Sequence, residues 1–447
     1  MSSGNLFAAL RAAFPADLDA TAIETADGPG APRFYTWRDL ERGTAMLANL
    51  LASLELPAGA RVAVQTEKSV EALMLYLAVL RAGYVYLPLN TAYQQAEIEY
   101  FVGNAEPAVV VCSPKNFTWL SRLAFKAGTR NVFTLGDDRS GSLLDRAALM
   151  SDRHVPAAKR ADELAAILYT SGTTGRSKGA MLTHGNLLSN ALVLKDYWGW
   201  RPGDVLIHAL PIFHVHGLFV ASHGALLNGS RMIWFAKFDP RATIARFAEA
   251  TVFMGVPTLY VRLLAESALS REACAHMRLF IAGSAPLLME TFNEFRERTD
   301  HTILERYGMS ETAMLTSNPY DPKLGERRGG TVGFPLPGVS LRVQNDAQRL
   351  AAEQFGRTNL LDSASFMEQV ANGDFGRSLA AAQLGQNIAQ PLSGLDPGSF
   401  VNLAVGNSNQ AANAQQQAMA GAGGLGQQQA QAAERQLPVQ ALERHVV

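Results

Sequence analysis

The sequence predicts an α/β fold in which mainly parallel sheets are covered by helices on both faces. From about Asp162 onward, short apolar runs alternate with longer amphipathic runs, which is typical of βαβ units. The chain has 447 residues, of which 48% are hydrophobic, enough to bury the cores of two or three domains. Ligands of such sheets bind at the carboxyl ends of the strands, so we expect the functional residues there.

The elements after Asp162 are predicted from apolar runs and from the residues that begin and end helices. Thr183 is a favourable N-cap, Asp239-Pro240 has the form of a helix start, and Gly229 marks a helix end. We expect strands at 165–169, 180–182, 204–210, 231–235, 252–254 and 279–282. We expect helices at 183–194, 217–227 and 239–250, after Pro257 and from Leu287.

The N-terminal third shows the same alternation. Helices are expected at 38–54 and 68–82, strands at 61–65 and 108–112, and a turn at 88–90. We therefore divide the body of the chain into a first α/β subdomain at 1–160 and a second at 161–345, and we expect the functional residues in the second.

The charge balance excludes the usual signature of a nucleic-acid binder. The 39 Lys and Arg residues are matched by 40 Asp and Glu residues, whereas nucleic acids and anionic membranes attract clustered positive charge. Two isolated cysteines, Cys112 and Cys274, exclude a disulfide scaffold and a cysteine metal cluster. The longest apolar run, 72–80, is too short to span a bilayer, and no targeting pattern is seen. We expect a cytoplasmic protein with no nucleic-acid or membrane partner; its oligomeric state is not predicted.

The composition changes abruptly near residue 345. Glutamine occurs four times in residues 1–345 and sixteen times in 346–447, and the later segment holds no Lys, Trp, Tyr or Cys. Residues 402–431 are mostly Asn, Gln, Ala and Gly, which offer little apolar surface to offset chain entropy. We interpret 346–447 as an unrelated Gln/Ala/Gly-rich tail on an enzyme-like body, largely disordered or locally helical at 378–388.

A loop rich in Gly, Ser and Thr at 169–179 is the strongest local signal for function. Small residues let the backbone approach an anion, hydroxyl and N–H groups donate to phosphate oxygens, and Lys178 supplies positive charge. The loop is not a Walker A motif, because Ser177 rather than Gly precedes the lysine. A flexible turn is the alternative interpretation, which the length of the loop between two predicted strands disfavours.

Five further blocks accompany this loop. They lie at 211–217 (PIFHVHG), 255–258 (GVPT), 283–287 (GSAPL), 307–312 (YGMSET) and 333–338 (GFPLPG). Together with the loop they resemble the acyl-adenylate-forming superfamily of acyl-CoA synthetases, luciferases and nonribosomal adenylation domains. Residues 1–343 are most similar to malonyl-CoA synthetases. The resemblance implies the large N-terminal domain of the adenylate-forming fold, with two mainly parallel sheets packed with helices.

The resemblance also implies an ATP-dependent acid–thiol ligase. In the family reaction, malonate attacks the α-phosphate of Mg·ATP, which forms malonyl-AMP and expels pyrophosphate, and the thiol of coenzyme A then displaces AMP. The implied cofactor is Mg²⁺, the implied cosubstrates are ATP and CoA, and the implied acid is malonate or methylmalonate. A hard cation with oxygen ligands masks the negative charge that would repel an attacking carboxylate.

The resemblance assigns the nucleotide site residue by residue. Glu311 would bind Mg²⁺ and Ser310 would hydrogen-bond the α-phosphate; with His214 they form the implied catalytic set. Tyr307 would stack on adenine. The other residues implied to bind ATP are Thr170, Ser171, Gly172, Thr173, Thr174, Gly175, Lys178, Gly283, Ser284, Ala285, Glu305, Gly308 and Met309. Taken singly, Glu311 would be interpreted as a surface acid and Tyr307 as a core aromatic residue.

The acid-binding site is predicted from the chemistry of a diacid. When one carboxylate is adenylated, the second must not be buried without a partner, and a bidentate arginine suits it. Arg262 is the predicted partner, helped by Ser284 and by His214, which the resemblance places beside the acyl pocket; Arg306 is the competing candidate. His214 and His216 could instead form an H-x-H metal site, or His214 could be an ordinary core histidine.

Two features of the family are not recognised in this chain. Asn372-Gly373-Asp374 is the nearest counterpart of the ribose-binding Thr-Gly-Asp but is better interpreted as a turn, and no lysine follows Lys323 to serve as the adenylation lysine. A positioned cation stabilises pentavalent phosphorus. We therefore expect an interrupted, chimeric malonyl-CoA synthetase, truncated before its barrel is complete, with slow adenylation and no thioester step. A nucleotide-binding module without turnover, or an interaction protein acting through its tail, is the alternative.

Overall fold

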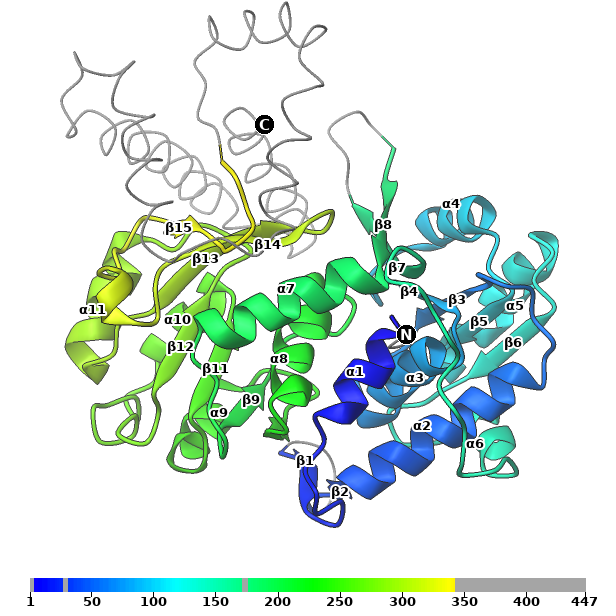
Figure 1. Cartoon of the computed structure of the whole chain (residues 1–447), viewed down its shortest axis with the longest axis horizontal. Helices are drawn as coiled ribbons and strands as arrows, with labels where there is room; N and C mark the ends of the chain where they lie inside the picture. The colour runs from blue at the N-terminus through cyan, green and yellow to red at the C-terminus, as the bar shows by residue number, and fades with distance from the viewer. Residues whose placement is uncertain (1–3, 27–30, 171–175, 342–447) are drawn as a thin grey trace, which may run out of the picture. The chain divides into compact units, whose positions relative to one another are not determined.

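The structure is a computed structural model that describes residues 4–26, 31–170 and 176–341 (Figure 1). It divides the chain after Val339 into two units. The predicted boundary at 345 and the predicted tail at 346–447, with its local helix, lie outside the described residues. The first unit ends at Val339 and holds every helix and strand of the described residues.

Two sheets form the framework of the described residues. The smaller has six strands in the order β6 (Asn131–Thr134), β5 (Val109–Cys112), β3 (Arg61–Gln65), β4 (Val85–Pro88), β7 (Leu164–Thr170) and β8 (Lys178–Thr183). The larger has nine strands in the order β15 (Phe334–Pro335), β14 (Ala313–Ser317), β13 (Leu304–Met309), β12 (Leu279–Ala282), β11 (Val252–Gly255), β9 (Val205–His208), β10 (Arg231–Trp234), β1 (Thr21–Thr25) and β2 (Phe34–Thr36).

Both sheets are mainly parallel, as predicted, but each carries antiparallel strands at its edges. β7 and β8, the two strands predicted on either side of the Gly/Ser/Thr-rich loop, form an antiparallel hairpin. β14 is also antiparallel to both of its neighbours, β13 and β15, and β1 is antiparallel to β2. The predicted α/β fold is confirmed, and the alternation of strands with helices breaks down at these hairpins.

The two sheets do not separate at residue 160, where the sequence placed the subdomain boundary. β1 from the N-terminal third pairs in parallel with β10 of the larger sheet, while β7, from beyond residue 160, pairs with β4 of the smaller one. Ala22 and Ile23 of β1 are fully buried, so this strand contributes side chains to the core between the two sheets. Exchange of strands between the two sheets makes residues 4–339 one framework.

Helices pack on both faces of each sheet (Figure 1). Between the sheets lie α1 (Leu6–Ala12), α3 (Val70–Arg81), α7 (His184–Tyr197) and α8 (Ser222–Leu227), in contact with one another. The outer face of the larger sheet is covered by α9 (Pro240–Ala245), α10 (Pro257–Leu264) and α11 (Met289–Thr299), and that of the smaller by α4 (Gln95–Ala105) and α5 (Phe117–Lys126). The remaining helices are α2 (Trp37–Ala52), α6 (Ser142–Ala147) and the short turns η1 (Pro114–Asn116), η2 (His216–Ala221), η3 (Phe247–Glu249) and η4 (Pro322–Leu324).

Alternation of side chains along the strands explains this layering. In β9, Leu206 faces the core between the sheets and Ile207 faces the outer core under α10; in β3, Val62 and Ala63 divide in the same way. Strands buried on both faces appear in the sequence as unbroken apolar runs. For this reason the predicted strands 61–65 and 279–282 coincide with β3 and β12.

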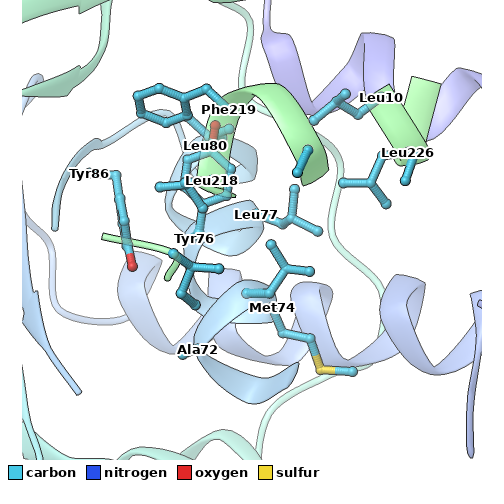
Figure 2. Close-up of a cluster of buried hydrophobic side chains, with 14 of the residues drawn as sticks. Leu10, Ala72, Met74, Tyr76, Leu77, Leu80, Tyr86, Leu218, Phe219 and Leu226 are labelled. Atoms are coloured by element: carbon cyan, nitrogen blue, oxygen red, sulfur yellow. The ribbon is translucent and has the colours of Figure 1, made fainter. Parts of the chain in front are cut away.

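The central core joins the two halves of the chain. Figure 2 shows Tyr76, Leu77 and Leu80 of α3 beside Leu218, Phe219 and Leu226 of η2 and α8. Tyr76 Oη lies 2.8 Å from His223 Nε2, so its hydroxyl is paired within this apolar contact. The helices η2 and α8 are therefore held against α3, the helix that follows β3 of the smaller sheet.

Several predicted helix boundaries agree with the structure. Thr183 caps α7 through a capping box with Asn186, Asp239 caps α9, and Gly229 follows α8 in the left-handed region at φ +63°. The predicted helix 217–227 begins as the π-helical turn η2 before α8, and the predicted helix 239–250 is divided into α9 and η3. Within the described ranges, no helix has the length and apolar character needed to cross a bilayer.

Candidate active site

A polar group, buried at two of its three residues, lies where the carboxyl ends of β9, β12 and β13 meet. It consists of His216 in η2, Ser284 in the loop after β12, and Arg306 in β13. Ser284 Oγ lies 3.4 Å from His216 Nδ1. A Cβ placed on Gly283 would lie 2.6 Å from Arg306 Cζ, so the guanidinium rests directly on the backbone beside Ser284. The three strands thus bring hydroxyl, imidazole and guanidinium groups together.

Arg306 is the most unusual member of this group. Its side chain is 2% exposed, and its three guanidinium nitrogens make no hydrogen bond to any of the described residues. Burial lowers the pKa of Arg306 to about 9, which leaves it charged at neutral pH. A buried charge without a partner is strongly unfavourable. The arrangement therefore suits an anionic ligand that supplies the missing acceptors.

His216, rather than the predicted His214, is the histidine that faces Arg306. Burial lowers the pKa of His216 well below its usual range, and the charge of Arg306 adds to this effect, so the imidazole is neutral. Its Nε2 has no hydrogen-bond partner among the described residues. His214 is exposed, with its ring centroid 4.9 Å from that of Phe213. The H-x-H motif therefore marked the right loop, but only its second histidine, His216, points inward.

The metal alternative for this histidine pair gains no support. Across residues 4–26, 31–170 and 176–341, no three His, Cys, Asp or Glu side chains are grouped as ligands for a metal ion.

The backbone of Ser284 is strained. It adopts φ +72°, a left-handed conformation that serine rarely takes. Strain of this kind is concentrated at ligand sites, and here it directs the hydroxyl toward His216.

The predicted adenine and Mg²⁺ block forms the β13–β14 hairpin. Tyr307, Gly308 and Met309 lie in β13, and Ser310 and Glu311 lie in the turn that follows, where Glu311 is exposed. Asn190 of α7 holds this hairpin: its Nδ2 donates to Met314 O at 2.8 Å, and Met314 N–H donates to its Oδ1 at 3.2 Å. The structure brings this block beside the Gly283–Ala285 loop, since β12 and β13 are neighbours.

The predicted phosphate loop is described at its two ends. Thr170 closes β7 and pairs with Lys178, the first residue of β8, which is exposed. Tyr100 Oη donates to Ser177 O at 2.8 Å and so fixes the returning strand. The predicted phosphate-binding residues Ser171, Gly172, Thr173, Thr174 and Gly175 lie outside the described residues.

Arg262, the predicted malonate partner, occupies a different position. It is exposed on α10, its guanidinium lies 4.8 Å from the ring centroid of Phe238, and its Nη2 donates to Phe238 O at 3.3 Å. It borders a cavity of about 340 Å³ between the carboxyl ends of strands from both sheets. Other lining residues are Thr66, Lys68, Ile212, Phe213 and Lys237. Arg262 therefore belongs to the rim of this cavity.

Glu305 is buried on the opposite side of β13 from Arg306. Its Oε1 accepts a hydrogen bond from Leu287 N–H at 3.1 Å, and its Oε2 has no partner among the described residues. Burial raises the pKa of Glu305 from 4.5 to about 7, although the Leu287 N–H opposes the shift. The residue thus links the predicted adenine loop to β13.

We predict that Glu305 makes stability fall as pH rises. The pKa of Glu305 is 4.5 in the unfolded chain and about 7 in the folded chain. Between these two pH values the carboxyl group is ionised in the unfolded chain and protonated in the folded one, so the unfolded state binds fewer protons. We measure the free energy of unfolding of both proteins by thermal unfolding at about pH 5 and about pH 8. Between these two pH values, the wild type should lose up to about 3 kcal/mol more of this free energy than Glu305→Gln loses. Equal pH dependence in the two proteins would contradict the prediction.

Comparison with known protein families agrees with the fold and the site described above. The model of the AMP-binding enzyme family matches residues 11–356, beyond residue 343 where the resemblance was expected to end. The chain belongs to this family. The predicted resemblance to the acyl-adenylate-forming superfamily is confirmed.

Its relatives include several malonate–CoA ligases. Malonate–CoA ligase of Arabidopsis thaliana is 32% identical over 311 residues, 64% of this chain and 50% of that protein. The ATP-bound crystal structure of MatB from Rhodopseudomonas palustris has 54% identity and a TM-score of 0.73, covering 77% of this chain and 66% of that one. A malonyl-CoA ligase with methylmalonyl-CoA and AMP bound has 31% identity and a TM-score of 0.63, covering 75% and 67%. The chain spans about half the length of the curated relatives it matches.

Proposed function

We propose that this chain binds ATP and a short dicarboxylic acid, malonate or methylmalonate, as the large domain of an AMP-forming acid–CoA ligase. The observation that carries the proposal is the buried, unpartnered guanidinium of Arg306 beside Ser284 and His216. A monocarboxylic acid would leave this charge unpaired, whereas the second carboxylate of malonate would accept its hydrogen bonds. The malonate–CoA ligases among the relatives support the same substrate class.

Arg306 replaces Arg262 as the proposed partner of the free carboxylate. The exposed side chain of Arg262 would gain little from a carboxylate, because water screens the pair. The buried side chain of Arg306 would gain much more, since the ligand removes an existing penalty. Ser284 would donate a further hydrogen bond, and neutral His216 would bind without adding charge.

In the proposed reaction, the other carboxylate of the acid attacks the α-phosphorus of ATP. A carboxylate–phosphorus bond forms, the bond to the bridging oxygen breaks, and pyrophosphate leaves. Arg306 would orient the acid by holding its far end, while Tyr307 would hold the adenine and Ser310 the α-phosphate. Burial of Arg306 and His216 keeps water away from the acid end of the site.

Glu311 fits the proposed Mg²⁺ site. Its carboxylate is exposed in the turn after β13, next to the hydroxyl of Ser310. Mg²⁺ is commonly bound by one or two carboxylates together with substrate phosphates, so a larger protein cage is not required. When bound, the ion would mask phosphate charge against the attacking carboxylate.

The cavity bordered by Arg262 is the proposed approach of the thiol cosubstrate. It has apolar walls at Ile212 and Phe213 and positive side chains at Lys237 and Arg262. An elongated thiol with a phosphorylated end matches both features. Part of the loop 209–216 lines this cavity, and His216 at the end of the same loop is influenced by the charge of Arg306, so the two substrates would meet at that loop.

Trapping with hydroxylamine tests the proposal. The protein is incubated with Mg·ATP and malonate, methylmalonate or a fatty acid in parallel, and the acyl hydroxamates are measured. We expect malonate or methylmalonate to react and the fatty acid to give none. A fatty-acid product in the absence of a malonate product would refute the dicarboxylate assignment.

A binding module without turnover is the second candidate, and it has its own measurement. Titration calorimetry with AMP and with a malonyl sulfamate of adenosine, a non-hydrolysable mimic of malonyl-AMP, reports binding whether or not adenylation occurs. Tight binding of the mimic without hydroxamate formation would favour this candidate.

A further inference from the structure

Lys68 connects the smaller sheet to the candidate active site. It lies in the loop between β3 and α3, and its Nζ donates to His208 O at 2.8 Å and to Phe235 O at 2.6 Å, at the carboxyl ends of β9 and β10. The same Nζ lies 3.0 Å from His208 Nδ1 and 4.3 Å from the ring centroid of Trp234. The ammonium thus ties two strand ends of the larger sheet to the smaller one.

The Lys68 ammonium and the Gly217 carbonyl together favour one position for the proton of the His208 ring. An ammonium group can only donate, so Nδ1 must accept. Burial lowers the pKa of His208 well below its usual range, and the charge of Lys68 adds to this effect, so the ring is neutral. Its single proton is therefore on Nε2, where Gly217 O lies at 2.9 Å and Ser222 Oγ at 3.1 Å.

The Gly217 carbonyl closes the loop that carries the acid-binding histidine. It accepts from His208 Nε2–H and from the Ser222 hydroxyl at 2.9 Å, which joins the end of β9 to η2 and α8. Gly217 also packs tightly, because a Cβ there would lie 2.1 Å from Pro211 O. His216, the neighbour of Gly217, is the residue that faces Ser284 and Arg306.

We propose that Lys68 is a positioning residue for the acid-binding site, acting through the tautomer of His208. If the proton were on Nδ1, it would face the ammonium, and the Nε2 lone pair would face the Gly217 carbonyl oxygen. Both contacts would become repulsive, and the closed loop 209–216 would shift. Lys68 thus controls acid binding from the other sheet without touching the acid. The binding part of this inference rests on the proposed function.

Two substitutions and their combination test the inference. Lys68→Met removes the charge and keeps the apolar stem. His208→Gln keeps a nitrogen donor near the Nε2 position but has no tautomer to choose. We expect Lys68→Met to weaken binding of the malonyl sulfamate by about tenfold or more while AMP affinity stays within about twofold. In the His208→Gln background, the same lysine substitution should have almost no further effect. Lys115→Met, which removes an exposed lysine paired with Glu67, is the matched control.

The ¹⁵N chemical shifts of the His208 ring report which of its nitrogens carries the proton. They would not change if Lys68 had only a structural role. The wild type should show the Nε2-protonated pattern, and Lys68→Met should show the Nδ1-protonated form or a mixture. An unchanged pattern in Lys68→Met, or a full lysine effect in the His208→Gln background, would overturn the inference. Failure of wild-type protein to prefer the malonyl over an acetyl sulfamate would refute the proposed function instead, while the ¹⁵N shifts would still decide the link between Lys68 and His208.

Discussion

Arg306→Met is expected to make the ligand-free protein more stable and to abolish its preference for a diacid. The substitution removes a buried charge that has no partner among the described residues and keeps an unbranched apolar side chain in its place. Replacing buried charges by apolar residues of similar volume stabilises proteins by about 1–4 kcal/mol in favourable cases. The melting temperature should therefore rise.

The same substitution should weaken malonyl sulfamate binding by about 100-fold, because the free carboxylate would then be buried without its cation. An acetyl sulfamate lacks that carboxylate and should bind the variant at least as well as the wild type. Calorimetry with the two sulfamates and AMP separates these effects. Equal losses for both sulfamates would show that Arg306 supports the pocket's shape and does not recognise a second carboxylate.

Arg278→Met is the matched control for stability. Arg278 is a half-buried arginine at the opposite end of the larger sheet, and its Nε donates to Asp204 Oδ1 at 2.7 Å while its Nη2 donates to Oδ2. Its removal leaves the buried Asp204 carboxylate without its cation and should cost about 3–5 kcal/mol. Opposite signs for the two arginine variants are the expected result. Destabilisation of both would mean that Arg306 has a structural partner in the folded state.

Local patterns were sufficient for the fold class and for most elements of the parallel framework. β3 and β12 are buried on both faces, so their apolar runs end where the strands end. Thr183 and Asp239 begin helices through side-chain caps that depend only on neighbouring residues. These features need no information from distant parts of the chain.

The exchange of strands between the sheets could not be predicted in this way. β1 is separated from its partner β10 by about two hundred residues, and β7 pairs with both β4 and β8. Hydrophobic periodicity identifies a strand but does not name its neighbours. The subdomain boundary at residue 160 therefore followed the order of the chain and missed the pairing of the strands.

The residues proposed to bind the acid show the same limit at the level of single side chains. Arg262 and Arg306 are both arginines near family blocks, and only the structure shows that the first is exposed and the second buried against Gly283. In a strand, the spacing of two would place His214 and His216 on the same face, but they lie in an irregular turn that leads into η2, where one is exposed and the other buried. The chemistry of a diacid suggested an arginine and a histidine, and the burial of individual side chains distinguishes between the candidates.

Gly308→Ala is expected to disrupt the nucleotide site. Gly308 lies at the register shift of the β13–β14 hairpin, and a Cβ there would lie 2.1 Å from Ala313 O and 2.6 Å from Met314 Cε. The opposing strand cannot easily retreat, because Asn190 holds Met314 through both its backbone N–H and its carbonyl. The hairpin must therefore open, which displaces Tyr307 and the turn after it.

We expect Gly308→Ala to weaken AMP binding by about tenfold or more and to lower stability by about 2–4 kcal/mol, since a backbone clash cannot be relieved by a side-chain rotation. Gly103→Ala in α4 is the matched control: its Cβ would meet no atom within 4 Å, and alanine favours a helix, so stability should be unchanged or higher. Calorimetry with AMP and thermal unfolding of both variants make the comparison. Normal AMP affinity in a destabilised Gly308→Ala protein would show that the hairpin does not bind adenine. The loop at 283–285 would then hold the base, because that loop follows β12 and does not move with β14.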